Sequence, residues 1–415
     1  MKTVLSKLDE ARINLDANTD YMVKKITEIC EKIGPRAPGS KEEFAAQQSM
    51  GEDLKKWSDD VSFEEFIVHR QAFMGFIPFT VAMAIIATIL YFSYPLVAFL
   101  LTVLGFIPLV LEFLMYKQFI DPLFKGHTSH NVIATRKPTG ETKKRIIFVG
   151  HSDSQYEWIL NYKLGGTGMK LFLIPAVVGL IACCAASLIK HLTIGLHGAS
   201  SEAQSTFFLI VGIVLCVFIV PYIGFLFFQS YTKSVPGAND NLSGCLSVMS
   251  VLKLMDEADV RFENTEVIAM FSGSEEEGLR GAKAFAKEHK KELEDMETVF
   301  IGVDTLRDYD FYAIYSRDMT FTVKSDPQVC ALLKQASLNA GLDLPYKAIF
   351  LGASDAAAVC KAGFKGATLA AMDPAPARYY HTRLDTGDNL DLKSIETGIN
   401  IMLESVFLYD EQGLK

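Results

Sequence analysis

The sequence lacks a CxxC pair, an excess of basic residues and, over several long segments, any charged residue at all. Its seven cysteines are scattered along 415 residues. This spacing predicts neither a disulfide framework nor a cysteine zinc site and is typical of a reducing compartment. The net charge of −9 argues against general nucleic-acid binding, which needs clustered lysine and arginine. The N-terminus has no apolar run, so no cleaved signal peptide is expected.

Half of the residues are hydrophobic, and the missing charges show where the apolar excess lies. Residues 71–111 contain no Asp, Glu, Lys or Arg, a length that accommodates two spans of roughly 20 residues each. The sequence Ser93-Tyr94-Pro95 is a turn signal between them. A second pair of uncharged runs covers 171–189 and 203–232. We therefore predict four transmembrane helices in two hairpins, at about 72–92, 96–116, 170–190 and 206–228. The alternative is a set of helices buried in a soluble core, but core helices do not need uncharged runs of this length.

Glu112 interrupts the second predicted span near its end. Intramembrane carboxylates are often functional. A charge so close to a helix end more often reaches the membrane interface, and this is the reading we favour.

A hairpin leaves and re-enters the membrane on the same side. The polar segments 1–70, 117–169 and 229–415 are therefore expected to form one domain, interrupted by the hairpins 71–116 and 170–228. Cytoplasmic flanks of spans carry the excess of Lys and Arg. The basic residues on the domain side are Arg70, Lys117, Lys125, Lys163, Lys170 and Lys233. The far side has Lys190, so an integral, multi-pass protein with a cytoplasmic polar domain is predicted.

The polar domain alternates between strand and helix patterns. Short apolar runs predict buried strands at 145–150, 265–271 and 297–303, with a weaker strand at 366–371. Helical patterns lie at about 242–256, 278–293, 327–340 and 391–409. This alternation predicts an α/β sheet with helices on both faces. In such sheets the functional site forms at the carboxyl ends of the strands.

Histidines and carboxylates follow these strand ends. His151 and Asp153 follow the first strand, Glu275 and Glu276 follow the second, and Asp304 ends the third. Two more candidates are Asp240, in a turn before a helix, and His381, in a late loop. This mixture of ligand types suits a divalent metal, and zinc in particular. The other histidines considered, His127 and His130, are interpreted as loop residues without a role in the site.

The spacing of these candidates has a chemical logic. In His151-Ser-Asp153, one side chain can bind metal while the other accepts the remaining ring N–H. In Glu275-Glu276, one can bind metal while the other takes a proton from the nucleophilic water. Asp240 lies in a turn and can bridge two ions with its two oxygens. A pair of bridged ions polarises a carbonyl and generates hydroxide near neutral pH.

Several stretches of the polar domain resemble the di-zinc aminopeptidases of metallopeptidase clan MH, family 28. The matching stretches are GPRAPGSKEE (34–43), HNVIA (130–134), VGHSDS (149–154), PGANDNLSG (236–244), FSGSEEEGLRGAKAF (271–285), VD (303–304), SDAAAVCKAGFKGATL (354–369) and YYHTRLDTGDNLD (379–391). The resemblance implies a mixed sheet flanked by helices, as in phosphorylase/hydrolase-like zinc exopeptidases. The two membrane hairpins are not typical of the family.

The resemblance also implies roles for individual residues. His151 and Asp304 would hold one zinc ion, Glu276 and His381 the other, and Asp240 would bridge them. Glu275 would be the general base and acid, and Asp153 would orient His151. Ser354-Asp355 would support the site, and Tyr379 or Tyr380 would help to stabilise the oxyanion.

The function expected from this is a membrane-bound exopeptidase with two zinc ions per chain, most simply an aminopeptidase acting on peptides. Two alternatives remain open. One is a carboxypeptidase, deacylase or single-zinc glutaminyl cyclase on the same fold. The other is a non-catalytic membrane scaffold. The sequence makes no prediction of oligomeric state.

Overall fold

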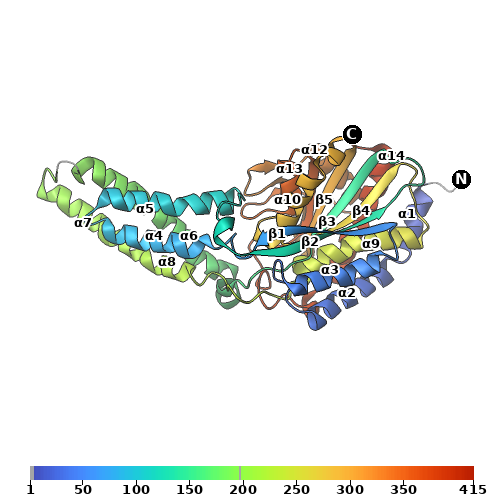
Figure 1. Cartoon of the computed structure of the whole chain (residues 1–415), viewed down its shortest axis with the longest axis horizontal. Coiled ribbons are helices and arrows are strands. Elements are labelled where there is room, and N and C mark those ends of the chain that lie inside the picture. Colours follow the sequence, from blue (N-terminus) through green and yellow to red (C-terminus); the bar gives the residue numbers. More distant parts are fainter. Residues whose placement is uncertain (1–3, 196–197) are drawn as a thin grey trace. The chain divides into compact units, whose positions relative to one another are not determined.

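The computed structural model describes residues 4–195 and 198–415, and this part of the chain divides into two compact units (Figure 1). The sheet unit contains the described residues up to Arg70, Gly126–Tyr156 and Lys233–Lys415. The helical unit contains Gln71–Lys125 and Glu157–Thr232. The segment between the third and fourth predicted spans, 170–190 and 206–228, includes residues 196–197, which lie outside the described residues. The assignment of the sheet unit as a peptidase domain and of the helical unit as membrane hairpins stays a prediction.

The sheet unit is built on one mixed sheet of nine strands within the described residues, in the order β1-β2-β4-β3-β5-β9-β6-β7, with β8 paired to β6. The strands are β1 Asp60–His69, β2 Gly126–Arg136, β3 Lys144–His151, β4 Thr265–Ser272, β5 Glu297–Leu306, β6 Tyr312–Asp318, β7 Val323–Lys324, β8 Tyr346–Ala348 and β9 Lys365–Ala371. The central strands β4, β3, β5 and β9 run parallel. Strands β1, β2 and β6 pair antiparallel to their neighbours in this order.

Helices cover both faces of this sheet (Figure 1). The helices of the sheet unit are α1 Val4–Arg12, α2 Leu15–Lys32, α3 Lys41–Leu54, α9 Ser243–Glu257, α10 Arg280–Glu288, α11 Lys290–Glu294, α12 Pro327–Asn339, α13 Asp355–Lys361 and α14 Leu392–Gln412. Alternate residues of a strand point to opposite faces. In β3, Ile146 and Phe148 belong to the larger core, with α2, α3, α9, α12 and α14, whereas Ile147 and Val149 pack in the core with α10, α11 and α13. The sheet is therefore buried on both sides, as parallel strands require.

The four predicted strands and the predicted α/β class are confirmed, since they correspond to β3, β4, β5 and β9. The helical pattern at 278–293 is divided between α10 and α11 at His289. One prediction was wrong. His127 and His130 do not lie in a loop but in strand β2, where His130 is buried and stacks on Phe44 with ring centroids 4.1 Å apart.

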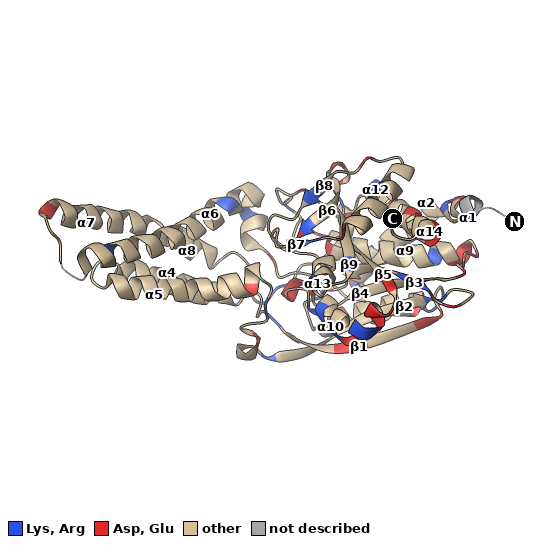
Figure 2. Ribbon diagram, turned by 90° about the horizontal axis from the view of Figure 1, so that it is seen from above, with Lys and Arg blue, Asp and Glu red and all other residues tan. Residues whose placement is uncertain are grey.

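The helical unit consists mainly of apolar helices with few charged residues (Figure 2). Its helices are α4 Phe76–Leu90, α5 Pro95–Pro108, α6 Ile159–Lys190, α7 Glu202–Val217 and α8 Ile219–Phe225, with short π-helices at Leu109–Leu114 and His191–Gly195. Three continuous helices in the described chain are long and apolar enough to cross a membrane: Pro95–Leu114, Ile159–Gly195 and Glu202–Phe225. Helix α4, at the first predicted span, has 15 residues and is shorter than a typical span.

The two charged residues considered at the ends of the predicted spans are buried in this unit. Glu112 accepts backbone N–H bonds from Phe119 and Ile120 at 2.8 and 3.2 Å, so it binds the chain that follows its helix. Lys190 donates to the carbonyls of Tyr91 and Phe92, each at 2.9 Å. These carbonyls lie at the C-terminal end of α4, where helix carbonyls lack partners. Lys190 therefore links the end of α6 to the turn between α4 and α5.

Candidate metal centre

The candidate ligands come from the carboxyl ends of adjacent parallel strands and from two loops. His151 is the last residue of β3, and Asp304 lies near the end of the neighbouring β5. Glu275 and Glu276 form a short 3-10 turn after β4. Asp240 lies in the turn Ala238–Leu242, directly before α9. His381 lies in the loop after β9, with a positive φ of 55°.

The structure brings these side chains together around Asp240. Asp240 Oδ1 is 3.1 Å from His151 Nε2, and Asp240 Oδ2 is 2.8 Å from His381 Nε2. The two histidines thus lie on different oxygens of one carboxylate. Asp304 Oδ1 is 3.9 Å from His151 Nε2, on the first side, and Glu276 Oε1 is 3.3 Å from His381 Nε2, on the second.

Asp153 lies behind this cluster, and both of its oxygens are used. Its Oδ1 is 3.4 Å from His151 Nδ1, the ring nitrogen that faces away from Asp240. The same oxygen accepts the backbone N–H of Glu275 at 3.0 Å, and Oδ2 accepts that of Glu276 at 3.1 Å. Asp153 therefore connects the end of β3 to the loop that carries the two glutamates.

Three residues that hold the site were missed by the sequence reasoning. Asp385 accepts the backbone N–H groups of Asn239 and Asp240 at 2.8 and 3.0 Å. Gln155 Nε2 donates to Glu276 Oε2 at 2.6 Å. The fully buried Arg36 donates to the carbonyls of Ser152, Pro236 and Gly237, so it joins the loop after β3 to the turn of Asp240. Asp385 lies four residues after His381, and Gln155 lies two residues after Asp153. This closeness in sequence to predicted site residues was the signal that could have identified them.

Burial and mutual charge perturb the ionisation of the cluster. Burial raises the pKa of Glu275 well above its usual value, and the nearby carboxylates Glu276, Asp355 and Asp304 raise it further. Burial opposes the charged form of His151, but Glu275 and the bonds to Asp153 and Asp240 outweigh it, so the pKa of His151 is well above its ordinary value. Burial likewise opposes ionisation of Asp240, but the adjacent imidazole rings of His151 and His381 outweigh it and hold its pKa low.

The buried charge and the orphaned atoms fit a cation. One atom each of His151, Asp240 and Glu276 lies within 4.8 Å of the others, a spacing that a metal ion can join. Asp240 Oδ2 and Glu276 Oε1 are buried and face the His381 ring at 2.8 and 3.3 Å, but neither accepts a well-oriented hydrogen bond among the described residues. Burying several carboxylates so close together is costly unless cations compensate them. Imidazole and carboxylate ligands in this number suit zinc.

The supporting residues suggested by the resemblance occupy different places. The Asp355 carboxylate accepts a hydrogen bond from Ser272 at the end of β4, and Ser354 Oγ donates to Asp318 Oδ2 at 2.5 Å. Tyr379 donates its hydroxyl to Asp308 at 2.9 Å, whereas the ring of Tyr380 stacks on His381 with centroids 3.8 Å apart. Of the two tyrosines, Tyr380 is therefore the one in contact with a candidate ligand.

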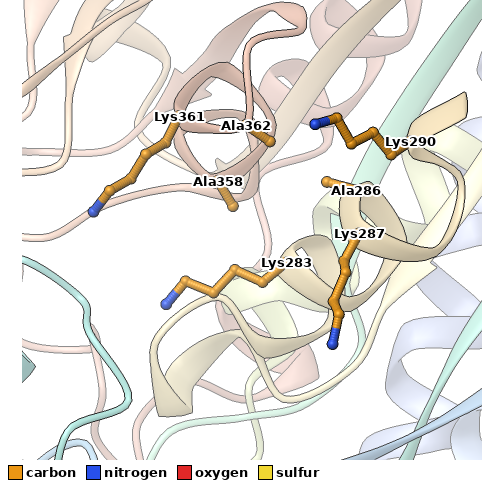
Figure 3. Close-up of a pocket in the computed structure, with 7 residues that line it drawn as sticks. All are labelled: Lys283, Ala286, Lys287, Lys290, Ala358, Lys361 and Ala362. Carbon is orange, nitrogen blue, oxygen red and sulfur yellow. The ribbon is translucent and has the colours of Figure 1, made fainter. Parts of the chain in front are cut away.

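A hollow of about 340 Å³ lies away from the candidate ligands in the sheet unit, on α10, α11 and α13. Its floor contains the buried Ala286 and Ala358, and four lysines surround it: Lys283, Lys287, Lys290 and Lys361. Figure 3 shows their ammonium groups pointing in different directions and not toward one centre. The arrangement is that of a solvated helical surface and gives no specific site for an anion.

Comparisons with known proteins find a peptidase family and a similar curated protein. Residues 226–406 match Peptidase family M28. A protein of Acetivibrio thermocellus named "Putative aminopeptidase" is 24% identical over 214 residues, which cover 50% of this chain and 60% of that protein. The chain thus matches less than two thirds of the length of this curated relative.

Solved structures share the fold at low sequence identity. The aminopeptidase from Aneurinibacillus sp. strain AM-1 has a TM-score of 0.56 and 16% identity, covering 94% of this chain and 93% of that chain. The zinc aminopeptidase BSAP from Bacillus subtilis has a TM-score of 0.54 and 14% identity, covering 95% of each. The glutaminyl cyclase of Fimbriiglobus ruber has a TM-score of 0.53 and 14% identity, covering 94% and 95%. At these identities the solved structures show that the fold is shared.

Proposed function

We propose that the protein is a membrane-bound zinc exopeptidase, and an aminopeptidase in particular. The observation that carries this proposal is the placement of His151 and His381 on opposite oxygens of Asp240, at 3.1 and 2.8 Å. A bridging carboxylate with one histidine on each side is the arrangement that a pair of ions requires. The family match and the aminopeptidases among the similar structures support the same reading.

The ligands divide into two sets. His151 and Asp304 would hold one zinc ion, Glu276 and His381 would hold the other, and Asp240 would contact both. Asp153 fixes the orientation of the His151 ring from behind, and Gln155 holds Glu276 through its second oxygen. Such outer partners orient ligands and increase their basicity.

Zinc bound here would polarise the scissile carbonyl and lower the pKa of a water nucleophile. Glu275 supplies the proton transfer. Its Oε2 lies 4.0 Å from His151 Nε2, beside the ligands. Burial among other carboxylates raises its pKa, as a group that must both accept and donate a proton near neutral pH requires. Glu275 would take a proton from the attacking water and pass it to the leaving amine.

The substitution Glu275→Gln tests this role. It should leave the zinc content unchanged, because Glu275 is not among the proposed ligands, and lower kcat by about 10²- to 10⁴-fold. The measurement combines metal analysis of the purified full-length protein with turnover of an aminoacyl reporter substrate. Full activity of the zinc-loaded variant would show that the assignment of the base is wrong.

A substrate panel separates the aminopeptidase from its alternatives. Aminoacyl reporters with a free α-amine should be cleaved, and their N-blocked equivalents should not. Turnover of blocked substrates alone would replace the aminopeptidase by a deacylase or carboxypeptidase. The glutaminyl cyclase among the similar structures makes cyclisation of N-terminal glutamine the second activity to assay. About two zinc ions per chain favour the peptidase, one favours the cyclase, and none favours a scaffold.

We also propose that the helical unit crosses the bilayer four times, as two hairpins, with the sheet unit in the cytoplasm. The support is the apolar composition of its helices and the excess of Lys and Arg on the domain side of the predicted spans. Helix α4 would complete the set of four by including the apolar residues that flank it. A C-terminal green fluorescent protein should fluoresce, and a C-terminal alkaline phosphatase should be inactive; the reverse pattern would invert the topology.

A further inference from the structure

Glu43 is a buried glutamate in the first turn of α3, far in sequence from the candidate ligands. Only 1% of it is exposed. Its Oε2 accepts the backbone N–H of Gly39 at 2.7 Å and the hydroxyl of Ser129, in β2, at 2.8 Å. The bond to Gly39, together with the cap that Ser40 forms with the Glu43 N–H at 3.0 Å, stabilises the start of the helix. Helix capping therefore accounts for one carboxylate oxygen.

The other oxygen of Glu43 binds the loop that carries Glu275. Glu43 Oε1 accepts the backbone N–H of Ser274 at 2.7 Å and also lies 3.3 Å from its hydroxyl. Ser274 directly precedes Glu275 and has φ 51° and ψ 43°. This left-handed conformation is unfavourable for a residue with a side chain. A buried carboxylate on its N–H is the contact that compensates this cost.

Glu43 and Asp153 act on consecutive peptide groups. The N–H of Ser274 is bound by Glu43, and those of Glu275 and Glu276 are bound by the two oxygens of Asp153 at 3.0 and 3.1 Å. Hydrogen bonds from backbone N–H groups to carboxylates are about twice as strong as neutral ones. Three successive amides are thus fixed by two buried side chains from other parts of the chain.

We propose that Glu43 is a positioning residue for Glu275, because it holds the backbone of Ser274 in the conformation from which the Glu275 carboxylate reaches the metal centre. This inference rests on the proposed function for its effect on turnover. Its effect on the loop does not depend on activity. Glu43 touches none of the reacting atoms and acts through the peptide of Ser274.

The test compares Glu43→Gln with Glu42→Gln in the full-length protein. Both residues lie in the first turn of α3, so both substitutions replace a glutamate by its amide at the same helix N-terminus. Glu42 is 35% exposed at its side chain and pairs with Lys41 at 3.8 Å, so it serves as the matched control. In Glu43→Gln the side chain keeps only one oxygen. Its NH₂ group must therefore face either the N–H of Ser274 or the N–H of Gly39, and the hydrogen bond on that side is lost.

Hydrogen exchange separates a positioning role from a capping role. Glu43→Gln should speed amide exchange in the loop Ser272–Leu279 by about tenfold or more, and by more than in α3 itself. If Glu43 only caps α3, exchange will instead rise in the first turn of that helix and stay unchanged in the loop. That outcome would overturn the proposal even if the protein had no peptidase activity.

Kinetics provide the second readout. A displaced base lowers the rate of the chemical step more than substrate binding. Glu43→Gln should therefore lower kcat about tenfold or more, with KM and zinc content within twofold of the wild type, whereas Glu42→Gln should match the wild type in all three. An unchanged kcat, or a loss that appears entirely in KM, would refute the proposal. Failure of the proposed function would instead appear as an absence of turnover in the wild type.

Discussion

Asp385 is expected to control zinc affinity although none of its atoms is a proposed ligand. Its Oδ1 accepts the backbone N–H and the side-chain amide of Asn239 at 2.8 and 2.7 Å, and its Oδ2 accepts the N–H of Asp240 at 3.0 Å. These bonds fix the turn from which Asp240 reaches both histidines. The substitution Asp385→Asn keeps the shape of the side chain but removes its charge and one acceptor.

The size of the effect follows from these contacts. The asparagine has one oxygen for donors that approach from two sides, so at least one N–H must face its NH₂ group. A hydrogen bond to a charged group contributes about 1.5–3 kcal/mol. With about 1.4 kcal/mol per factor of ten, loss of one such bond corresponds to zinc binding weakened by roughly 10- to 100-fold. This range agrees with that known for partners of metal ligands in general.

Competition with a chelator of known zinc affinity measures the change. The matched control is Asp388→Asn, which alters an exposed aspartate in the same loop, three residues further along. The control should bind zinc as the wild type does. If Asp385→Asn binds zinc within twofold of the wild type, the reasoning that the turn of Asp240 is held by Asp385 is wrong.

Two further predictions concern stability. The hydrogen bond to Glu64, followed by that to Glu292, raises the pKa of His289 to about 9 against a partial burial that lowers it. The folded state therefore binds the proton more tightly than the unfolded state, and this stabilisation is complete below about pH 6.5 and is lost as the pH rises through about 9. Converted directly, this pKa shift corresponds to about 3 kcal/mol, but solvent screening of the partly exposed pair reduces its contribution to about 1 kcal/mol. Urea denaturation at pH 6 and 9.5 should show the difference in the wild type and not in His289→Gln. In the helical unit, Lys190→Met removes two hydrogen bonds to carbonyls at the end of α4 and should lower the melting temperature in detergent by several degrees. The control Lys163→Met, at an exposed residue of the same helix α6, should not lower it.

Much of the sheet was predictable from sequence because its central strands are parallel and buried on both faces. Such strands are continuous apolar runs, as residues 146–150 illustrate. The strands β7 and β8 have two and three residues, too few for a periodic pattern. The order of the strands depends on pairing between distant segments, such as β2 with β4, which no local pattern encodes.

The first predicted span illustrates a limit of the same kind. The uncharged run from Gln71 continues well beyond the ends of α4, yet the helix covers only Phe76–Leu90. The hydrophobicity of a segment indicates how much of it avoids water. It does not indicate where the helix begins or ends, because turns are set by backbone conformation. Here Gln71 has a positive φ and a turn follows the last helical residues, near Tyr91. Helix length was therefore the less predictable quantity.

The proposed ligands were visible in sequence because each is a metal-binding residue type at the end of an element. The residues that hold them were not, since their partners are backbone amides from distant segments. Glu43 reads as an ordinary helix cap, and Asp385 as one of several acids in a loop. Neither residue type nor spacing reveals which distant N–H a carboxylate will bind.

The hydrogen bonds separate these two kinds of buried carboxylate on physical grounds. Both oxygens of Glu43, Asp153 and Asp385 already accept bonds from N–H groups. Their lone pairs are committed, so they can orient a metal site but are poorly placed to bind the metal. Asp240 and Glu276 instead each keep one buried oxygen that accepts no backbone N–H group and faces the ring of His381. Because an uncompensated buried carboxylate oxygen is costly, a cation bound between the proposed ligands would stabilise the fold of this site, and the carboxylates that hold backbone amides would determine where that cation lies.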